Sequence, residues 1–186
     1  MNLEEVTDIL RKKLPSLDCV TNLEWQDTLK LRHFVQHEFQ LHGYLSFATF
    51  ERVLDWKLRK QRKRTEKYRK NITGDLVREI SGCFYRIKHE NEEMERKIKI
   101  DILSAIPGVG IGVASTILTF AHPDQYAIID KRVWEVLYQE VKNSFTIDDY
   151  GRYLINARQI AESLDCDVHV VDFLLWKEYE DLHPMD

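Results

Sequence analysis

Residues 106–121 read IPGVGIGVASTILTFA, an uncharged stretch in a chain in which 31% of residues are charged. With residues 102–105, which are also uncharged, the stretch reaches the length of a membrane-spanning helix. Pro107 and the glycines Gly108, Gly110 and Gly112 would, however, break such a helix and leave backbone polar groups without partners in lipid. The stretch therefore predicts a short bend between two buried helices, and we expect no membrane partner.

Outside this bend the chain has the periodicity of helices. Apolar residues recur at three- and four-residue spacing in almost every segment, and only four prolines interrupt them. We therefore expect an all-α fold, with helices over about residues 2–14, 23–41, 47–58, 75–88 and 90–103. Other helix starts are indicated by capping residues, namely Ser46, Asp130, Thr146 and either Asp165 or Asp167.

The segment 90–103 is rich in charge. Glu92, Glu93 and Glu95 each precede a basic residue by four positions, an orientation that favours an exposed helix. This helix should lead directly into the bend, so that the two helices and the bend occupy about residues 97–121.

Length and composition fit one domain. A chain of 186 residues with 44% hydrophobic content can bury a core of its own, and its length allows two lobes. No charged start followed by an apolar run predicts a secretory signal, so we expect a cytoplasmic protein. An odd number of cysteines at distant positions argues against a disulfide framework, and three cannot ligate an iron–sulfur cluster: Cys19, Cys83 and Cys166.

Positive charge is concentrated in one segment. The net charge is −4, yet residues 57–70, KLRKQRKRTEKYRK, hold nine Lys or Arg residues against one acid. Such a run can attract a polyanion such as DNA, whereas many charge runs only face water as a helix extension or loop. The candidate DNA contacts in this run are Lys60, Arg62, Lys63 and Arg64.

The glycines of the bend have a specific physical use. Glycine allows a positive φ and a close approach, so the amides around Gly108 and Gly110 can point at one anion, such as a DNA phosphate. A dinucleotide fingerprint would need a glycine where Val113 stands, and no phosphate-binding Gly-Lys-Ser/Thr follows. A purely structural turn and a protein-contact hairpin remain the alternatives.

Two segments carry a family resemblance. The stretch IPGVGIGVASTIL resembles the helix-hairpin-helix element of the base-excision DNA glycosylase superfamily that includes endonuclease III. The segment IIDKRVWEVL resembles the part of that superfamily that carries the catalytic aspartate, and Asp130 follows Gly112 by the family's spacing of 18 residues. The resemblance covers about residues 100–140 and implies a glycosylase-like helical bundle.

The resemblance assigns roles to individual residues. It implies that Pro107, Gly108, Val109 and Gly110 grip a phosphate and that Asp130 is the catalytic aspartate, acting as a carboxylate. Gly112, which we also place among the DNA-binding residues, stands where lyase-competent members have a nucleophilic lysine. The resemblance therefore implies a monofunctional enzyme that hydrolyses the N-glycosidic bond, without a metal or another cofactor.

The expected mechanism begins with extrusion of the target nucleotide from the duplex. The Asp130 carboxylate would then stabilise the cationic sugar and orient a water molecule, although an aspartate at a helix start is also explained as an N-cap. Tyr126, His122 and Trp134 are candidates for the base pocket, and Trp134 also fits a core position.

These expectations define the partner and its alternatives. The partner should be double-stranded DNA with a damaged or modified base, bound by a monomer. The alternative is a non-catalytic helix-hairpin-helix DNA-binding module in which Asp130 serves only as a cap, or a protein-interaction scaffold that does not touch DNA.

Overall fold

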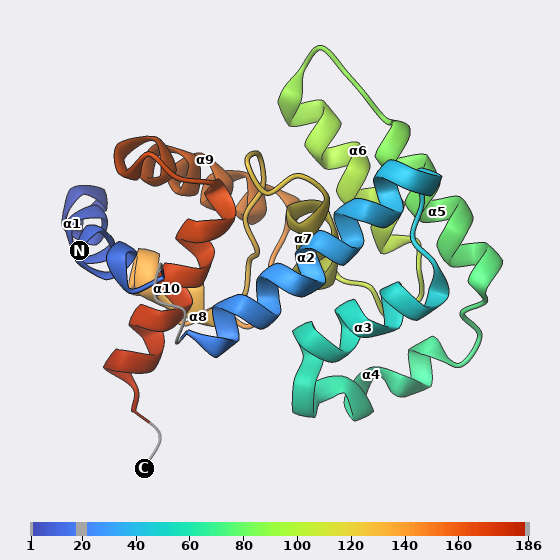
Figure 1. Ribbon diagram of the computed structural model, residues 1–186, viewed down its shortest axis with the longest axis horizontal. Helices are drawn as coiled ribbons and strands as arrows, with labels where there is room; N and C mark the ends of the chain where they lie inside the picture. The colour runs from blue at the N-terminus through green and yellow to red at the C-terminus, as the bar shows by residue number, and fades with distance from the viewer. Residues whose placement is uncertain (1, 18–21, 185–186) are drawn as a thin grey trace. The chain divides into compact units, whose positions relative to one another are not determined.

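The chain folds entirely as helices over the part that the structure describes. This computed structural model describes residues 2–17 and 22–184, with 75% helix and no strand among those residues (Figure 1). The all-α prediction is confirmed. The α-helices run in the order α1 (Leu3–Lys13), α2 (Leu23–His42), α3 (Phe47–Leu58), α4 (Arg62–Arg69), α5 (Gly74–Arg86), α6 (Glu92–Ser104), α7 (Ile111–Ala121), α8 (Lys131–Tyr138), α9 (Ile147–Leu164) and α10 (Val168–Leu182).

The helices form two compact units. The inserted unit is the continuous segment from Lys30 to Ala121, and the terminal unit contains the described residues before and after that segment. Helix α2 begins in the terminal unit and ends in the inserted one. None of the helices in residues 2–17 and 22–184 is long and apolar enough to cross a membrane.

The inserted unit is built around α3. This helix packs on α5 and α7, and α6 packs on both α5 and α7. Ser46 caps α3 as predicted, because its hydroxyl accepts the Thr49 amide at 3.2 Å. Glu38 of α2 holds the same corner: its carboxylate accepts the Ser46 amide at 2.8 Å and the Thr49 hydroxyl at 2.7 Å. The start of α3 is therefore held both by its own cap, Ser46, and by Glu38 of the preceding helix.

The terminal unit joins α1 to the last three helices. Helix α10 packs on α8 and α9, and α1 packs on α9 and α10. Thr146 starts α9 as predicted, in a capping box with Asp149, and Asp130 starts α8. The core of this unit is mostly apolar, with buried side chains from each helix that include Val6, Leu10, Trp25, Leu137, Leu154, Ile160 and Leu174.

Two details of the predicted helices are wrong. Neither Asp165 nor Asp167 caps α10 through its side chain: Asp165 adopts a left-handed conformation at the end of α9, and Asp167 makes no capping hydrogen bond. Helix α6 is also not simply exposed, because Arg96 and Lys99 are buried on its inner side. The Lys99 Nζ lies 2.6 Å from the Glu95 carboxylate. The four-residue spacing therefore predicted this ion pair but not its burial.

Candidate nucleic-acid interface

The predicted bend is a hairpin between α6 and α7. Pro107, Gly108 and Gly110 are exposed at its tip, while Val109 is buried. The Val109 amide donates to the Ile106 carbonyl at 3.0 Å and closes the turn. The buried Val109 side chain thus anchors a loop whose other tip residues are exposed.

Helix α4 packs against this hairpin at Gly108. The φ of Gly108 is +80°, and a Cβ placed there would lie 3.2 Å from Tyr68 Cβ and 3.2 Å from Arg69 Cγ. A side chain at this position would therefore be strained and crowded, which explains the glycine. The contact brings the hairpin and the basic segment together in the inserted unit.

The start of α7 presents backbone donors near the same tip. The Gly110 carbonyl accepts the amides of Val113 and Ala114 at 3.0 and 2.9 Å, so the helix ladder begins there. The amides of Gly110, Ile111 and Gly112 come before the first hydrogen bond of the helix, so they have no acceptor within it. No acidic residue occupies the first turn of α7. This end of the helix can therefore face an anion.

The basic segment is neither a plain helix extension nor a loop. Helix α3 ends at Leu58, Arg59 has a φ of +44°, and a short 3₁₀ turn leads into α4. Arg62 is ion-paired with both Glu51 and Asp55, so this predicted DNA contact holds α4 against α3. Lys63 is exposed.

The two remaining candidates of this segment cannot be placed in the same way. The side chains of Lys60 and Arg64 lie outside the part of the chain that the structure describes. Their backbones belong to the 3₁₀ turn Arg59–Gln61 and to α4, respectively.

Asp130 belongs to the terminal unit, where it caps α8. Its backbone is extended, and its Oδ1 accepts the amides of Arg132 at 2.9 Å and Val133 at 3.2 Å. The side chain is half-buried. The helix N-terminus favours the negative charge of this carboxylate.

The loop before Asp130 is held by buried polar groups of α9 and α10. Asp172 accepts the Ile128 amide at 2.7 Å, and the Tyr153 hydroxyl donates to the Ile128 carbonyl at 3.1 Å. The Tyr150 hydroxyl donates to the Ala127 carbonyl at 3.2 Å. These contacts fix the backbone that carries Asp130.

The protonation of Tyr153 suits its role as a donor. Burial, and after it the carboxylates of Asp172 and Asp130, raises the pKa of Tyr153 well above its ordinary value. Sequence reasoning missed these groups of α9 and α10. In the sequence, each of these groups is a polar residue on an otherwise apolar helix face. Such a residue suggests a buried hydrogen bond but does not show which group it bonds to.

The three base-pocket candidates differ in exposure. Tyr126 is buried, and Trp134 is fully buried with its ring centroid 4.2 Å from that of Tyr138. His122 is half-buried, with its ring centroid 6.2 Å from that of Tyr126. The burial of the Tyr126 and Trp134 rings does not fit direct stacking on a base, because neither offers an open face.

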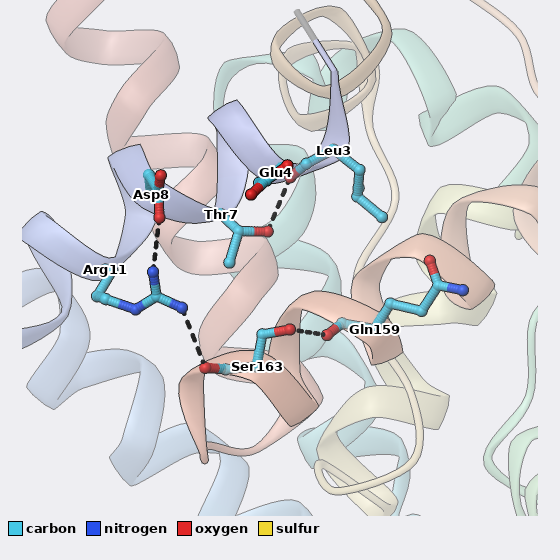
Figure 2. A pocket seen from close by; sticks show the side chains of 7 residues that line it. All are labelled: Leu3, Glu4, Thr7, Asp8, Arg11, Gln159 and Ser163. Atoms are coloured by element: carbon cyan, nitrogen blue, oxygen red, sulfur yellow. Dashed lines mark hydrogen bonds and ion pairs between the residues drawn. The ribbon is translucent and has the colours of Figure 1, made fainter.

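A pocket of about 450 Å³ lies between α1 and α9 of the terminal unit (Figure 2). Arg11 donates to the Asp8 carboxylate at 2.6 Å and to the Ser163 carbonyl at 3.3 Å. The hydroxyls of Thr7 and Ser163 donate to carbonyls of their own helices. These hydrogen bonds engage the side chains of Thr7, Asp8, Arg11 and Ser163, and no predicted site residue lines the pocket.

The described residues include no group of three or more His, Cys, Asp or Glu side chains that could hold a metal ion. Comparison of the chain with protein-family models, with curated proteins and with solved structures found no match.

Proposed function

We propose that this protein binds duplex DNA through the hairpin between α6 and α7. The observation that carries the proposal is the packing of the basic helix α4 on Gly108, since it places positive charge beside the exposed tip of the hairpin. Backbone amides at a helix start suit a phosphate, and lysines and arginines nearby strengthen its attraction.

We further propose that the bound DNA is a substrate for base removal. In the terminal unit, the Asp130 carboxylate lies on a loop fixed by Tyr150, Tyr153 and Asp172. As an anion it would stabilise the cationic sugar while the C1′–N bond breaks, and water would add to C1′. Gly112 offers no amine, so hydrolysis without a covalent intermediate is the expected reaction. This is the chemistry that the family resemblance implies.

The test is release of free bases from DNA that contains alkylated, deaminated and oxidised nucleotides, detected by mass spectrometry. We expect base release by the natural protein and none by Asp130→Asn. Asparagine is as good an N-cap as aspartate, so this variant removes the charge and keeps the helix start. Asp167→Asn is the matched control, because Asp167 also precedes a helix but makes no side-chain cap.

Undiminished release by Asp130→Asn would overturn the catalytic role. The second candidate is a DNA-binding module without catalysis, and two observations favour it: Oδ1 of Asp130 is engaged as a cap, and the Tyr126 and Trp134 rings are buried. DNA binding without base release would support this module. Affinity that does not change with salt would instead favour a protein scaffold, since phosphate contacts make binding strongly salt-dependent.

A further inference from the structure

A basic pocket of about 750 Å³ lies beside the hairpin in the inserted unit. Its wall comes from α3, α4 and the turn between them, and includes the cations Arg59, Lys63, Arg69 and Lys70. Arg59, at the break between the two helices, has a φ of +44°. The pocket therefore lies where the chain passes from α3 to α4.

Part of the positive charge in the pocket is not neutralised by the protein. Glu51 is paired with Arg62 and lies 3.7 Å from Arg69. Lys63 and Lys70 are exposed, and neither makes an ion pair within the described part of the chain. Glu66 is the other carboxylate of the wall. The wall retains an excess of positive charge, which favours an anionic ligand.

Arg69 is the buried anchor of the pocket. Its side chain is only 8% exposed, and Nη2 donates to the Arg62 carbonyl at 2.8 Å. Its Nε is buried without a hydrogen-bond partner in the described structure. A buried donor without an acceptor is costly, and because Arg69 lines the pocket, a shift of its guanidinium toward a bound anion would give Nε an acceptor. The same side chain touches Gly108, so the anchor is also next to the hairpin tip.

We propose that this pocket binds a phosphate group, with Arg69 as the buried donor and Lys63 and Lys70 as the exposed cations. Guanidinium groups match the oxygens of a phosphate, and exposed lysines add charge without fixed geometry. The phosphate comes either from a DNA strand held by the hairpin or from a free mononucleotide. The DNA form of the proposal rests on the proposed function, and the mononucleotide form does not.

The experiment uses the full chain and two probes. A fluorescently labelled DNA duplex is titrated by anisotropy over a range of salt concentrations, and adenosine monophosphate is titrated by calorimetry. The test variant is Lys63→Ser with Lys70→Ser, since both side chains are exposed and folding should persist. The matched control is Lys12→Ser with Lys88→Ser, which removes the same charge from exposed positions elsewhere.

For the DNA source, the test variant should lose about tenfold in affinity at about 0.1 M salt, and its salt slope should fall by about one, as for one phosphate contact. The control should keep both values. Glu66→Gln should bind DNA more tightly than the natural protein, because it removes a carboxylate from the wall. Arg69→Lys, which keeps the charge but loses the guanidinium, should weaken binding in a protein with unchanged circular dichroism.

The outcomes distinguish failure of this proposal from failure of the proposed function. Equal DNA affinity for test and control variants, with no binding of adenosine monophosphate, would overturn the phosphate pocket and leave DNA binding intact. Binding of adenosine monophosphate that the test variant loses, in a protein that does not bind DNA, would support the pocket and overturn the proposed function. Weakened DNA binding by the test variant alone would support both.

Discussion

At the scale of single residues, the hairpin glycines are not equivalent. Gly108 has a φ of +80° and would press a Cβ against Tyr68 and Arg69, whereas a Cβ at Gly110 meets nothing within 4 Å. Gly108→Ala should therefore lower the free energy of unfolding by about 1 to 2 kcal/mol, and Gly110→Ala by less than about 0.5 kcal/mol. Urea denaturation of both variants measures this. Equal losses would show that Gly108 is not constrained.

A second residue-scale prediction concerns Glu95 and the buried Lys99. Burial alone would raise the pKa of Glu95, but hydrogen bonds from Lys99 and from the His89 amide outweigh it, so the pKa lies below its ordinary value of 4.5. The stabilisation is therefore complete above the unfolded pKa and disappears as the pH falls through the lower folded pKa. Denaturation should show a loss of stability in this acidic range that Glu95→Gln reduces.

The matched control for this pair is Glu93→Gln. Glu93 pairs with Lys97 at the same spacing and 2.8 Å, but both groups are solvent-accessible. Exposed pairs contribute little, so this variant should keep nearly the natural stability at neutral pH, while Glu95→Gln leaves Lys99 buried with a weaker partner and loses more. Similar losses for the two variants would contradict this account.

At the scale of elements, the loop of residues 122–130 depends on α9 and α10. Tyr153→Phe removes the donor to the Ile128 carbonyl and should cost about 1 kcal/mol. Asp172→Ala leaves the buried Ile128 amide without its acceptor and should cost about 1 to 3 kcal/mol, of which Asp172→Asn should recover part. Thermal and urea unfolding measure these losses. Hydrogen exchange at Ile128 should accelerate in Asp172→Ala, and an unchanged rate would show that the loop is held elsewhere.

The same scale shows what sequence could predict. Ser46, Asp130 and Thr146 were found as caps because a cap acts within three residues. The bend was also found, because proline and glycine act locally. The turn into α4 was missed. Arg62 at the start of α4 pairs with Glu51, eleven residues away, and residues 59–67 contain no apolar side chain that would indicate a packed helix.

The candidate site follows the same division. The glycines of the hairpin and Asp130 could be named from local pattern and resemblance. Asp172, which lies 44 residues from the loop it holds, and Arg69, whose burial depends on packing at Gly108, could not. The burial of Tyr126 and Trp134 could not be predicted either, because a sequence does not show which face of an aromatic ring the fold covers.

At the scale of the whole molecule, the inserted unit is continuous in sequence and the terminal unit is not. We expect a polypeptide of residues 30–121 to fold by itself, because α3, α5, α6 and α7 bury one another's apolar faces. Residues 122–186 alone lack α1 and Trp25, which complete the terminal core, and should not unfold cooperatively. Circular dichroism during urea titration distinguishes the two pieces, and cooperative unfolding of the second would contradict the expectation.

The packing of α1 on α9 and α10 also sets an order of events in the cell. Ribosomes add roughly 5 to 20 residues per second, so on the order of ten seconds separates the synthesis of α1 from that of α9. The inserted unit can be finished within that interval. Val6 and Leu10, which are buried in the folded protein, must meanwhile stay in water or be covered by a chaperone. Synthesis of the terminal unit thus starts before that of the inserted unit, and its folding can be completed only after the inserted unit has been made.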